Sequence, residues 1–386
     1  MARRICVVTG TRAEYGLLRP IMRAVGETRG LALQTVATGM HLARRFGYTV
    51  REIERDGFAI DARVRMTPTA DTNAAMAAGV GTGIRGLAAA FADLHPDVVL
   101  VLGDRVEAFA AATAAALSGI IVAHVHGGDR AEAGYDDYMR HAITKMAHLH
   151  FAATRASADR IARLGERRDR IRVVGAPGLD EIRTAVLPAP AALTERYGLD
   201  TARPYLLVVQ HPVSTHADRA AREMTATLTA VARGGLPALV IYPNADAGGR
   251  AIIDVIRRFG GRAGSAPVAV RSSVPRLDYL ALLKHAAALV GNSSSGIIEA
   301  PSFRTAVVNV GRRQAGRERA ANVIDVEPTA ADLTRGIERA LNDAAFRRRL
   351  ARCRSPYGTG RAGEKIARHL ARAVLDDRLR RKRITY

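Results

Sequence analysis

The chain has 386 residues, 48% of them hydrophobic, which is more than one core usually holds and enough for two globular domains. Its formal net charge of +21 suggests nucleic-acid binding, but the arginines are spread over every segment and form no aromatic-rich basic motif. Two distant cysteines exclude a disulfide framework and a cysteine-based metal site, and no apolar run approaches the length of a membrane span. We therefore expect a cytoplasmic protein.

Short apolar runs alternate with helical patterns in the first half of the chain. Residues 39–47 are expected to open a helix, and the Ala-rich stretch 67–93 predicts a long helix that breaks near its four glycines, because glycine weakens helices. This alternation predicts a doubly wound α/β domain. Its strands are expected at residues 5–8, 31–38, 98–102, 120–123 and 171–174, and its other helices at about 15–25, 106–117, 138–148 and 157–164.

The alternation restarts after a segment that carries two prolines within three positions, Pro188 and Pro190. Five more strands are expected at residues 205–209, 238–242, 287–290, 305–310 and 321–326. Two doubly wound Rossmann-like domains that face one cleft are typical of the GT-B fold class. We predict an N-terminal domain over 1–183, a linker over 184–204, a nucleotide-binding domain over 205–361, and over 362–386 a C-terminal helix and a basic tail. The helix is expected to pack back on the first domain, and the tail, with its basic run 378–383, to be solvated.

A polar cluster follows the strand expected at 120–123 and is the strongest candidate for chemistry. His124, His126, Asp129 and Asp137 lie in it, and Asp104 follows the preceding strand. Because ligands of open α/β sheets bind at the carboxyl ends of the strands, these groups are expected to face one crevice. Nearby arginines would hold the carboxylates ionised. The same residues have other interpretations: Asp104 and Asp137 are suitable helix caps, and two alternating histidines suggest zinc, although no third ligand follows at metal spacing.

Two turns suit anion binding. Gly10 and Arg12 stand between a strand and a helix, where backbone N–H groups and the guanidinium would suit a phosphate, although a single glycine is a weak motif and an ordinary βα turn is the alternative. Ser294, Ser295 and Gly296 stand in the same context in the second half, and a pyrophosphate is the ligand we expect there.

Six motifs occur in order along the chain and carry a family resemblance. They are Thr9-Gly-Thr-Arg-Ala-Glu-Tyr-Gly-Leu-Leu18, Gly103-Asp-Arg105, His124-Val-His-Gly-Gly128, Asp136-Asp137 with Arg140-His-Ala-Ile-Thr-Lys145, Pro243-Asn-Ala-Asp-Ala-Gly248 and Gly291-Asn-Ser-Ser-Ser-Gly-Ile-Ile-Glu-Ala-Pro-Ser302. From the first strand to about Asp325, the sequence resembles the hydrolysing UDP-N-acetylglucosamine 2-epimerases. The closer likeness is to the sialic-acid-pathway branch, which releases N-acetylmannosamine and UDP.

The resemblance implies an enzyme that eliminates UDP from a nucleotide sugar to give a glycal and then adds water with inversion at C2. Asp104, Asp129 and Asp137 match the acidic triad of the family; we expect Asp104 and Asp137 to be the acid/base pair, Asp129 to handle water or stabilise an oxocarbenium, and His126 to belong to the catalytic set. The resemblance also implies a homodimer without a metal or cofactor. Substrate contacts are expected from Gly10, Arg12, His211, Asn244, Asp246, Ser294, Ser295 and Gly296, with Glu299 on the ribose hydroxyls.

Asp129 departs from the family pattern, because this branch usually has Glu after His-Gly-Gly. A carboxylate withdrawn by roughly 1.5 Å matters, since misplacements near 1 Å cost about 100-fold in rate. The departure leaves open a different nucleotide sugar or phosphosugar. A GT-B glycosyltransferase and a non-catalytic binding protein for nucleotide sugars or nucleic acid also remain open.

Overall fold

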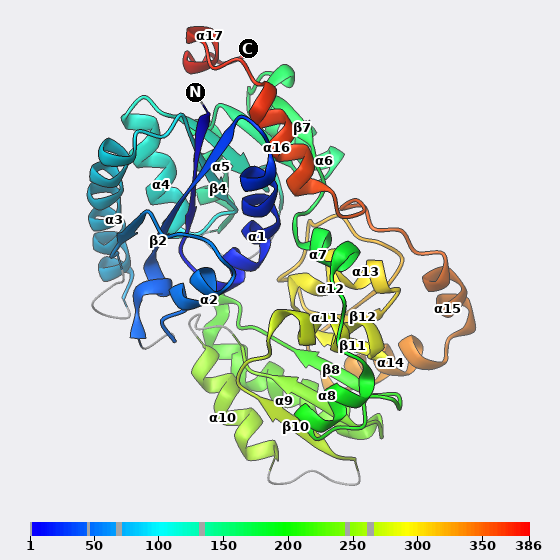
Figure 1. Ribbon diagram of the computed structural model, residues 1–386. Coiled ribbons are helices and arrows are strands. Elements are labelled where there is room, and N and C mark those ends of the chain that lie inside the picture. The colour runs from blue at the N-terminus through cyan, green and yellow to red at the C-terminus, as the bar shows by residue number, and fades with distance from the viewer. Residues whose placement is uncertain (1, 45–46, 67–71, 131–135, 244–247, 261–265) are drawn as a thin grey trace. The chain divides into compact units, whose positions relative to one another are not determined.

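The computed structural model describes residues 2–44, 47–66, 72–130, 136–243, 248–260 and 266–386, which form two compact units (Figure 1). Unit 1 takes the described residues of 1–129, 135–181 and 357–386, and unit 2 takes the rest. The chain therefore leaves unit 1 in a helix that ends at Thr184 and returns to it after Pro356.

Unit 1 is built on a sheet of seven parallel strands in the order β3-β2-β1-β4-β5-β6-β7. The strands are β1 (Arg3–Thr9), β2 (Leu31–Thr38), β3 (Ala62–Val64), β4 (Val98–Leu102), β5 (Ile121–Val125), β6 (Leu149–Ala152) and β7 (Ile171–Val173). The order of the strands reverses between β1 and β4, so the loops that follow these two strands border the switch point of the sheet, where such folds bind ligands.

Both faces of this sheet are covered, which explains its uninterrupted apolar strands. In β4, Val98, Leu100 and Leu102 pack on one side, while Val99 and Val101 pack on the other. The first side is covered by α1 (Arg12–Glu27) and α16 (Ala362–Arg372), and the second by α3 (Asn73–Leu94), α4 (Val106–Leu117) and α5 (Asp136–Met146). The shorter helices are η1 (Gly39–Leu42), α2 (Val50–Arg55), α6 (Arg155–Arg163), η3 (Arg168–Arg170), α7 (Gly178–Thr184) and α17 (Asp377–Arg380).

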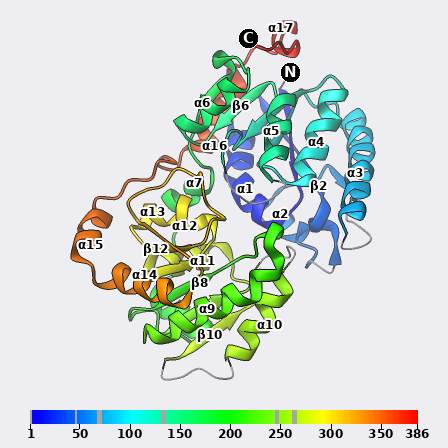
Figure 2. The same cartoon turned by 180° about the vertical axis from the view of Figure 1, so that it is seen from behind.

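Unit 2 repeats the architecture with six parallel strands in the order β10-β9-β8-β11-β12-β13 (Figure 2). Its switch point lies between β8 and β11. The strands are β8 (Leu206–Val209), β9 (Ala238–Ile241), β10 (Val268–Arg271), β11 (Ala288–Gly291), β12 (Ala306–Val310) and β13 (Val323–Val326). The helices are α8 (Pro190–Tyr197), η4 (Ser214–Arg219), α9 (Ala220–Arg233), α10 (Gly249–Gly260), α11 (Arg276–His285), α12 (Ser294–Ile298), α13 (Ala300–Phe303), α14 (Ala330–Asn342) and α15 (Ala344–Ala351).

The sequence prediction missed three strands. β3 and β6 have only three and four residues, and β10 has no fully buried residue, so none gives a long apolar run. The prediction of a helix over 39–47 was also wrong, because η1 already ends at Leu42, Ala43 is extended, and α2 begins at Val50.

The predicted break in the Ala-rich helix does not occur, and α3 is continuous. A Cβ atom at Gly83 would lie 2.9 Å from the sulfur of Met66, and one at Gly86 would lie 2.7 Å from Val64. These glycines therefore let the helix pack closely against the chain around β3. In the described part of the chain, α3 is also the one helix that is long and apolar enough to cross a membrane. The expectation that no apolar run approaches the length of a membrane span was therefore wrong. Its Leu87 and Phe91 are buried in the sheet-covering core of unit 1.

The segment 184–204 is not a simple linker. It contains α8, whose Leu193 and Tyr197 are buried in the core of unit 2. The basic tail is not solvated throughout either, because the ammonium of Lys382 donates to Glu166 at 2.5 Å, and Glu166 is also bonded to Lys145 and His150. A buried carboxylate attracts the cation, and this contact attaches the tail to unit 1.

The returning C-terminal segment is held by a long-range helix cap. The carboxylate of Asp180 accepts hydrogen bonds from the N–H groups of Ala362 (2.9 Å) and Gly363 (2.7 Å) at the start of α16. A Cβ atom at Gly363 would lie 2.6 Å from the carbonyl oxygen of Pro20, so α16 starts in close contact with α1. The segment is thereby joined to residues 182 or more positions earlier.

We predict that Asp180→Ala loosens α16 more than removal of an ordinary cap does. Two buried, charge-assisted hydrogen bonds are lost, which costs about 2–3 kcal/mol against about 1 kcal/mol for an exposed cap. The matched control is Asp343→Ala, which removes the exposed cap of α15. Amide hydrogen exchange in α16 should quicken in the first variant only; equal protection in both variants would contradict the assignment.

Candidate functional site

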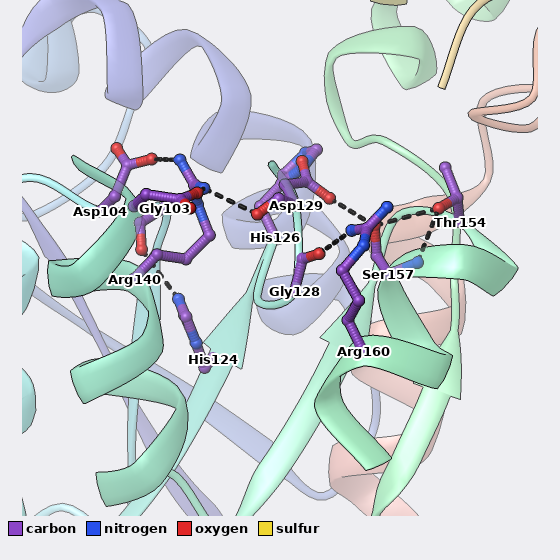
Figure 3. A network of polar contacts seen from close by, with 11 residues as sticks. Gly103, Asp104, His124, His126, Gly128, Asp129, Arg140, Thr154, Ser157 and Arg160 are labelled. Carbon is purple, nitrogen blue, oxygen red and sulfur yellow. Dashed lines mark hydrogen bonds and ion pairs between the residues drawn. The ribbon is translucent and has the colours of Figure 1, made fainter. Parts of the chain in front are cut away.

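The strands β4 and β5 deliver the polar cluster to the carboxyl edge of the unit 1 sheet (Figure 3). β4 leads into Gly103 and Asp104, and β5 leads into the loop from His126 to Asp129. The sequence prediction ended this strand too early, because β5 continues through Val125 and includes His124. Asp137 comes from the first turn of α5.

Arg140 of α5 joins these segments. Its guanidinium donates to the carboxylate of Asp104, to the carboxylate of Asp137 at 2.8 Å and to the backbone carbonyl of Asp129 at 2.7 Å. Only 1% of Arg140 is exposed, yet the negative charges of Asp104, Asp129 and Asp137 outweigh the effect of burial and raise its pKa. A buried cation is therefore compensated by carboxylates that three segments supply.

Asp104 and Asp137 remain accessible, whereas Asp129 does not. The side chains of Asp104 and Asp137 are 21% and 39% exposed, against 6% for that of Asp129. A carboxylate that is held by an arginine and still reaches solvent can exchange a proton with a bound molecule. The structure thus separates the three aspartates into two accessible groups and one buried group.

Asp129 uses both carboxylate oxygens inside the protein. One accepts a hydrogen bond from Nδ1 of His126 at 2.9 Å, and the other accepts from the hydroxyl of Ser157 at 2.8 Å. Since a carboxylate only accepts, Nδ1 of His126 carries a proton and Nε2 is the ring nitrogen that can exchange one when the ring is neutral. Thr154 donates to Ser157 in turn, at 3.0 Å.

The loop that carries His126 and Asp129 has a constrained backbone. His126 itself has a φ of 64°, and Gly128 has a φ of 74°. A Cβ atom at Gly128 would lie 2.2 Å from the carbonyl oxygen of Ser157, so only glycine fits there. The guanidinium of Arg160 donates to the carbonyl of Gly128 and closes the loop on α6.

His124 has a structural role in this cluster. Its Nε2 lies 2.8 Å from the carbonyl oxygen of Gly103 and must donate to it, while Nδ1, 3.2 Å from the hydroxyl of Thr144, accepts. Burial lowers the pKa of His124 to about 3, so the ring is neutral. Both nitrogens are thereby occupied, and the described residues contain no group of three or more His, Cys, Asp or Glu side chains placed to hold a metal ion.

The loop after β1 is arranged differently from the predicted anion site. The N–H of Gly10 donates to the carboxyl of Glu14 at 2.9 Å, and the guanidinium of Arg12 lies 3.2 Å from Glu52. A Cβ atom at Gly10 would lie 2.4 Å from Glu107, which explains the glycine. The N–H of Gly10 is therefore engaged by a side chain of the protein. Arg12, the first residue of α1, is the predicted anion contact that carries a positive charge.

Glu14 and Glu107 form a buried acidic pair that sequence reasoning missed. Both are about 95% buried, and Arg105 donates to Glu107 at 3.3 Å. Burial first, and then the charge of Glu107, raise the pKa of Glu14 to about 8. The spacing of Glu14 behind Gly10 resembles a helix-start signal, which concealed this role.

In unit 2, the loops after β8 and β11 meet at the switch point. The side-chain amide of Asn292 accepts from the N–H of His211 at 2.7 Å and donates to its carbonyl at 2.9 Å. Ser293 caps α12, and its hydroxyl lies 2.9 Å from that of Ser295, which also contacts the hydroxyl of Tyr279. His211 and the serine loop are thus brought together as the sequence suggested.

Two further predicted contacts, Ser294 and Gly296, belong to the first turn of α12. Gly296 packs on the sheet, since its Cβ would lie 2.8 Å from Val307, and its carbonyl accepts from Asn322. Ser294 begins α12 and is half-buried. Asn244 and Asp246 lie outside the described residues.

Glu299 is buried and only partly satisfied. One carboxylate oxygen accepts from the guanidinium of Arg276, and the other, Oε2, is buried without a hydrogen-bond partner in the described structure. An unpaired buried carboxylate oxygen is costly, so a hydroxyl donor at this position would be bound favourably. Arg276 and Tyr279, which complete the site, were not singled out from the sequence, because α11 has no motif that marks them.

We predict a pH effect from Glu14 that Glu14→Gln removes. Because the folded-state pKa of about 8 exceeds the ordinary 4.5, the stability that the neutral carboxyl contributes is fully present below about pH 4.5 and is lost as the pH rises through 8. The loss is on the order of several kcal/mol, at about 1.4 kcal/mol per pKa unit. Gln keeps an oxygen acceptor for the N–H of Gly10 but does not titrate. The free energy of unfolding, measured with urea between pH 5 and 8, should therefore depend less on pH in the variant than in the wild type. Parallel curves would contradict the assignment.

Comparisons with known proteins identify the family of the chain. The UDP-N-acetylglucosamine 2-epimerase family profile matches residues 23–371. The hydrolysing UDP-N,N'-diacetylbacillosamine 2-epimerase of Legionella pneumophila is 38% identical over 365 residues, covering 95% of this chain and 94% of that protein. The hydrolysing GDP/UDP-N,N'-diacetylbacillosamine 2-epimerase of Campylobacter jejuni is 32% identical over 326 residues, covering 84% of each protein.

A solved structure shows the same fold. The UDP-GlcNAc 2-epimerase of Neisseria meningitidis, bound to UDP-GlcNAc, superposes with a TM-score of 0.82 at 17% identity, covering 96% of this chain and all of that one. The predicted class of two doubly wound, Rossmann-like domains of GT-B type is confirmed. The family model and the full-length relative show the same membership: this chain belongs to the UDP-N-acetylglucosamine 2-epimerase family.

Proposed function

We propose that the protein is a hydrolysing 2-epimerase that releases UDP from a UDP-linked 2-acetamido sugar. The observation that carries the proposal is the pair of accessible carboxylates, Asp104 and Asp137, that one buried guanidinium holds at the carboxyl edge of the sheet. Elimination needs a base for the C2 proton and an acid for the departing oxygen, and two such groups suffice.

The reaction would proceed in two steps. A carboxylate takes the proton from C2 while the bond between C1 and the pyrophosphate oxygen breaks, which gives a glycal and UDP. Water then adds, with its oxygen bonding to C1 and a proton entering C2 from the opposite face. Arg140 donates to both carboxylates and thereby holds the two acid/base groups next to each other.

We propose a different role for Asp129 from the one its family position suggested. Both of its oxygens are occupied by His126 and Ser157, so it orients the imidazole and sets its tautomer. His126 would then exchange a proton through Nε2. An aspartate suits this role, since its short side chain reaches the histidine three residues earlier in the loop.

The sugar is the open part of the proposal. Our first candidate is UDP-N-acetylglucosamine, with N-acetylmannosamine and UDP as products. A specific observation favours a second candidate: the Legionella and Campylobacter relatives, at 38% and 32% identity, are both named for N,N'-diacetylbacillosamine substrates. An acceptor-dependent release of UDP would instead support a glycosyltransferase. A homodimer and a cytoplasmic location remain predictions.

The first experiment is turnover of a panel of nucleotide sugars in deuterated water. We expect UDP release with deuterium at C2 of the free sugar, and the better substrate of UDP-N-acetylglucosamine and UDP-N,N'-diacetylbacillosamine identifies the sugar. Asp104→Asn and Asp137→Asn should each lower kcat by about 100-fold or more, because a general acid or base contributes 10²–10⁴-fold. The control is Glu107→Gln, which changes an acid of the same unit outside the proposed acid/base pair. Circular dichroism checks that all three variants are folded. UDP release without deuterium at C2 would refute the elimination.

The second experiment concerns the nucleotide. Glu299→Ala should weaken UDP binding by calorimetry about 10-fold or more, because a hydrogen bond to a charged group contributes about 1.5–3 kcal/mol. Asp278→Asn is the matched control, since this buried acid of α11 is bonded to Arg196 and Tyr197 and faces the core. Unchanged UDP affinity in a folded Glu299→Ala protein would refute the ribose assignment.

A further inference from the structure

Unit 1 contains a pocket of about 400 Å³ that the proposed reaction does not use. It is bordered by Leu149 at the start of β6, by Arg172 in β7, and by residues between His369 and Leu379, a segment that includes the end of α16 and the start of α17. These are the amino ends of the strands. Asp104, His126 and Asp129 lie at the carboxyl ends, so the pocket is a separate site on the opposite edge of the sheet.

The lining of this pocket is strongly basic. Four arginines line it, Arg170, Arg172, Arg372 and Arg378. Among the described residues, no carboxylate forms an ion pair with any of the four guanidiniums.

The two acids that line the pocket are already engaged. Asp169 forms two hydrogen bonds of 2.9 Å with Arg167, and Asp376 caps α17 through the N–H of Leu379. Neither carboxylate forms an ion pair with a pocket arginine, and four guanidiniums against two carboxylates leave the pocket with an excess of positive charge.

Arg170 shows that this charge is built into the fold. It is only 7% exposed, and its guanidinium is positioned by a hydrogen bond to the carbonyl of Arg378. Burial, followed by repulsion from Arg167, lowers the pKa of Arg170, and the charges of Asp169 and Glu166 oppose this only in part. A buried cation without a carboxylate partner is costly, and an anion in the pocket would offset that cost.

We propose that this pocket binds a small phosphate monoester. Planar guanidiniums donate paired hydrogen bonds that match phosphate oxygens, and several of them around one cavity favour a dianion. The volume exceeds that of a phosphate ion, and Leu149, Ala373, Val374 and Leu379 supply an apolar wall for the organic part of the ester.

The test uses the full-length protein and two probes, inorganic phosphate and phenyl phosphate, titrated by calorimetry at physiological ionic strength. The variant R372Q/R378Q removes two guanidiniums whose side chains are exposed, so the fold should be retained. The control R347Q/R348Q makes the same change of charge on exposed positions of α15 in unit 2. Binding to the proposed nucleotide site is unaffected by either change, so the failure of one proposal is separable from that of the other.

We expect phenyl phosphate to bind more tightly than inorganic phosphate, and R372Q/R378Q to weaken binding by about 10-fold or more, given about 1.5–3 kcal/mol for each charged hydrogen bond. The control should bind as the wild type does. In the wild type and in the control, but not in R372Q/R378Q, phenyl phosphate should also slow amide exchange in α17. Equal weakening in both double variants would mean that the effect comes from the net charge of the protein and not from this pocket. Unchanged binding in R372Q/R378Q would mean that the anion binds elsewhere. Either result overturns the proposal.

Discussion

The burial of one cation, Arg140, determines how the carboxyl edge of unit 1 is assembled. A guanidinium that is 1% exposed cannot remain charged without partners, and its partners come from the β4 loop, the β5 loop and the first turn of α5. The same contacts place two carboxylates side by side. Removing Arg140 would therefore disturb the positions of the acids together with their charge, which makes it a positioning residue for the site.

The other constraint on this edge is the short loop from His126 to Asp129. Strands that are buried on both faces are mostly apolar, so polar side chains gather at the strand ends. This loop holds several such polar side chains between β5 and α6. Gly128 permits the contact with Ser157, and Arg160 and Arg140 each take a backbone carbonyl. The aspartate in this loop, in place of a glutamate, accepts two hydrogen bonds within the protein.

Both units use their switch points in the same physical way but with different chemistry. In unit 1, the loops after β1 and β4 surround a buried acidic pair, Glu14 and Glu107. In unit 2, the loops after β8 and β11 are joined by Asn292 and present hydroxyls and a partly satisfied Glu299. The accessible carboxylates of Asp104 and Asp137 in unit 1 suit proton transfer, and the hydroxyls and the unpaired Glu299 oxygen of unit 2 suit a nucleotide.

The sequence by itself determined the fold class and most of the strands, because a strand buried on both faces must be apolar throughout, as in β4 and β8. It also located the polar cluster at the carboxyl edge of unit 1 and the serine loop of unit 2, since polar groups directly follow the apolar strands β4, β5 and β11. The tertiary structure alone decided the continuity of α3, which depends on Met66 and Val64 packing against two glycines. It also decided the partners of Asp129, the occupation of the Gly10 N–H, and the attachment of the C-terminal segment by Asp180 and Lys382. The physical reason is that a hydrogen-bonding group takes whichever donor or acceptor the fold brings within about 3 Å, and most of these partners are distant in the sequence.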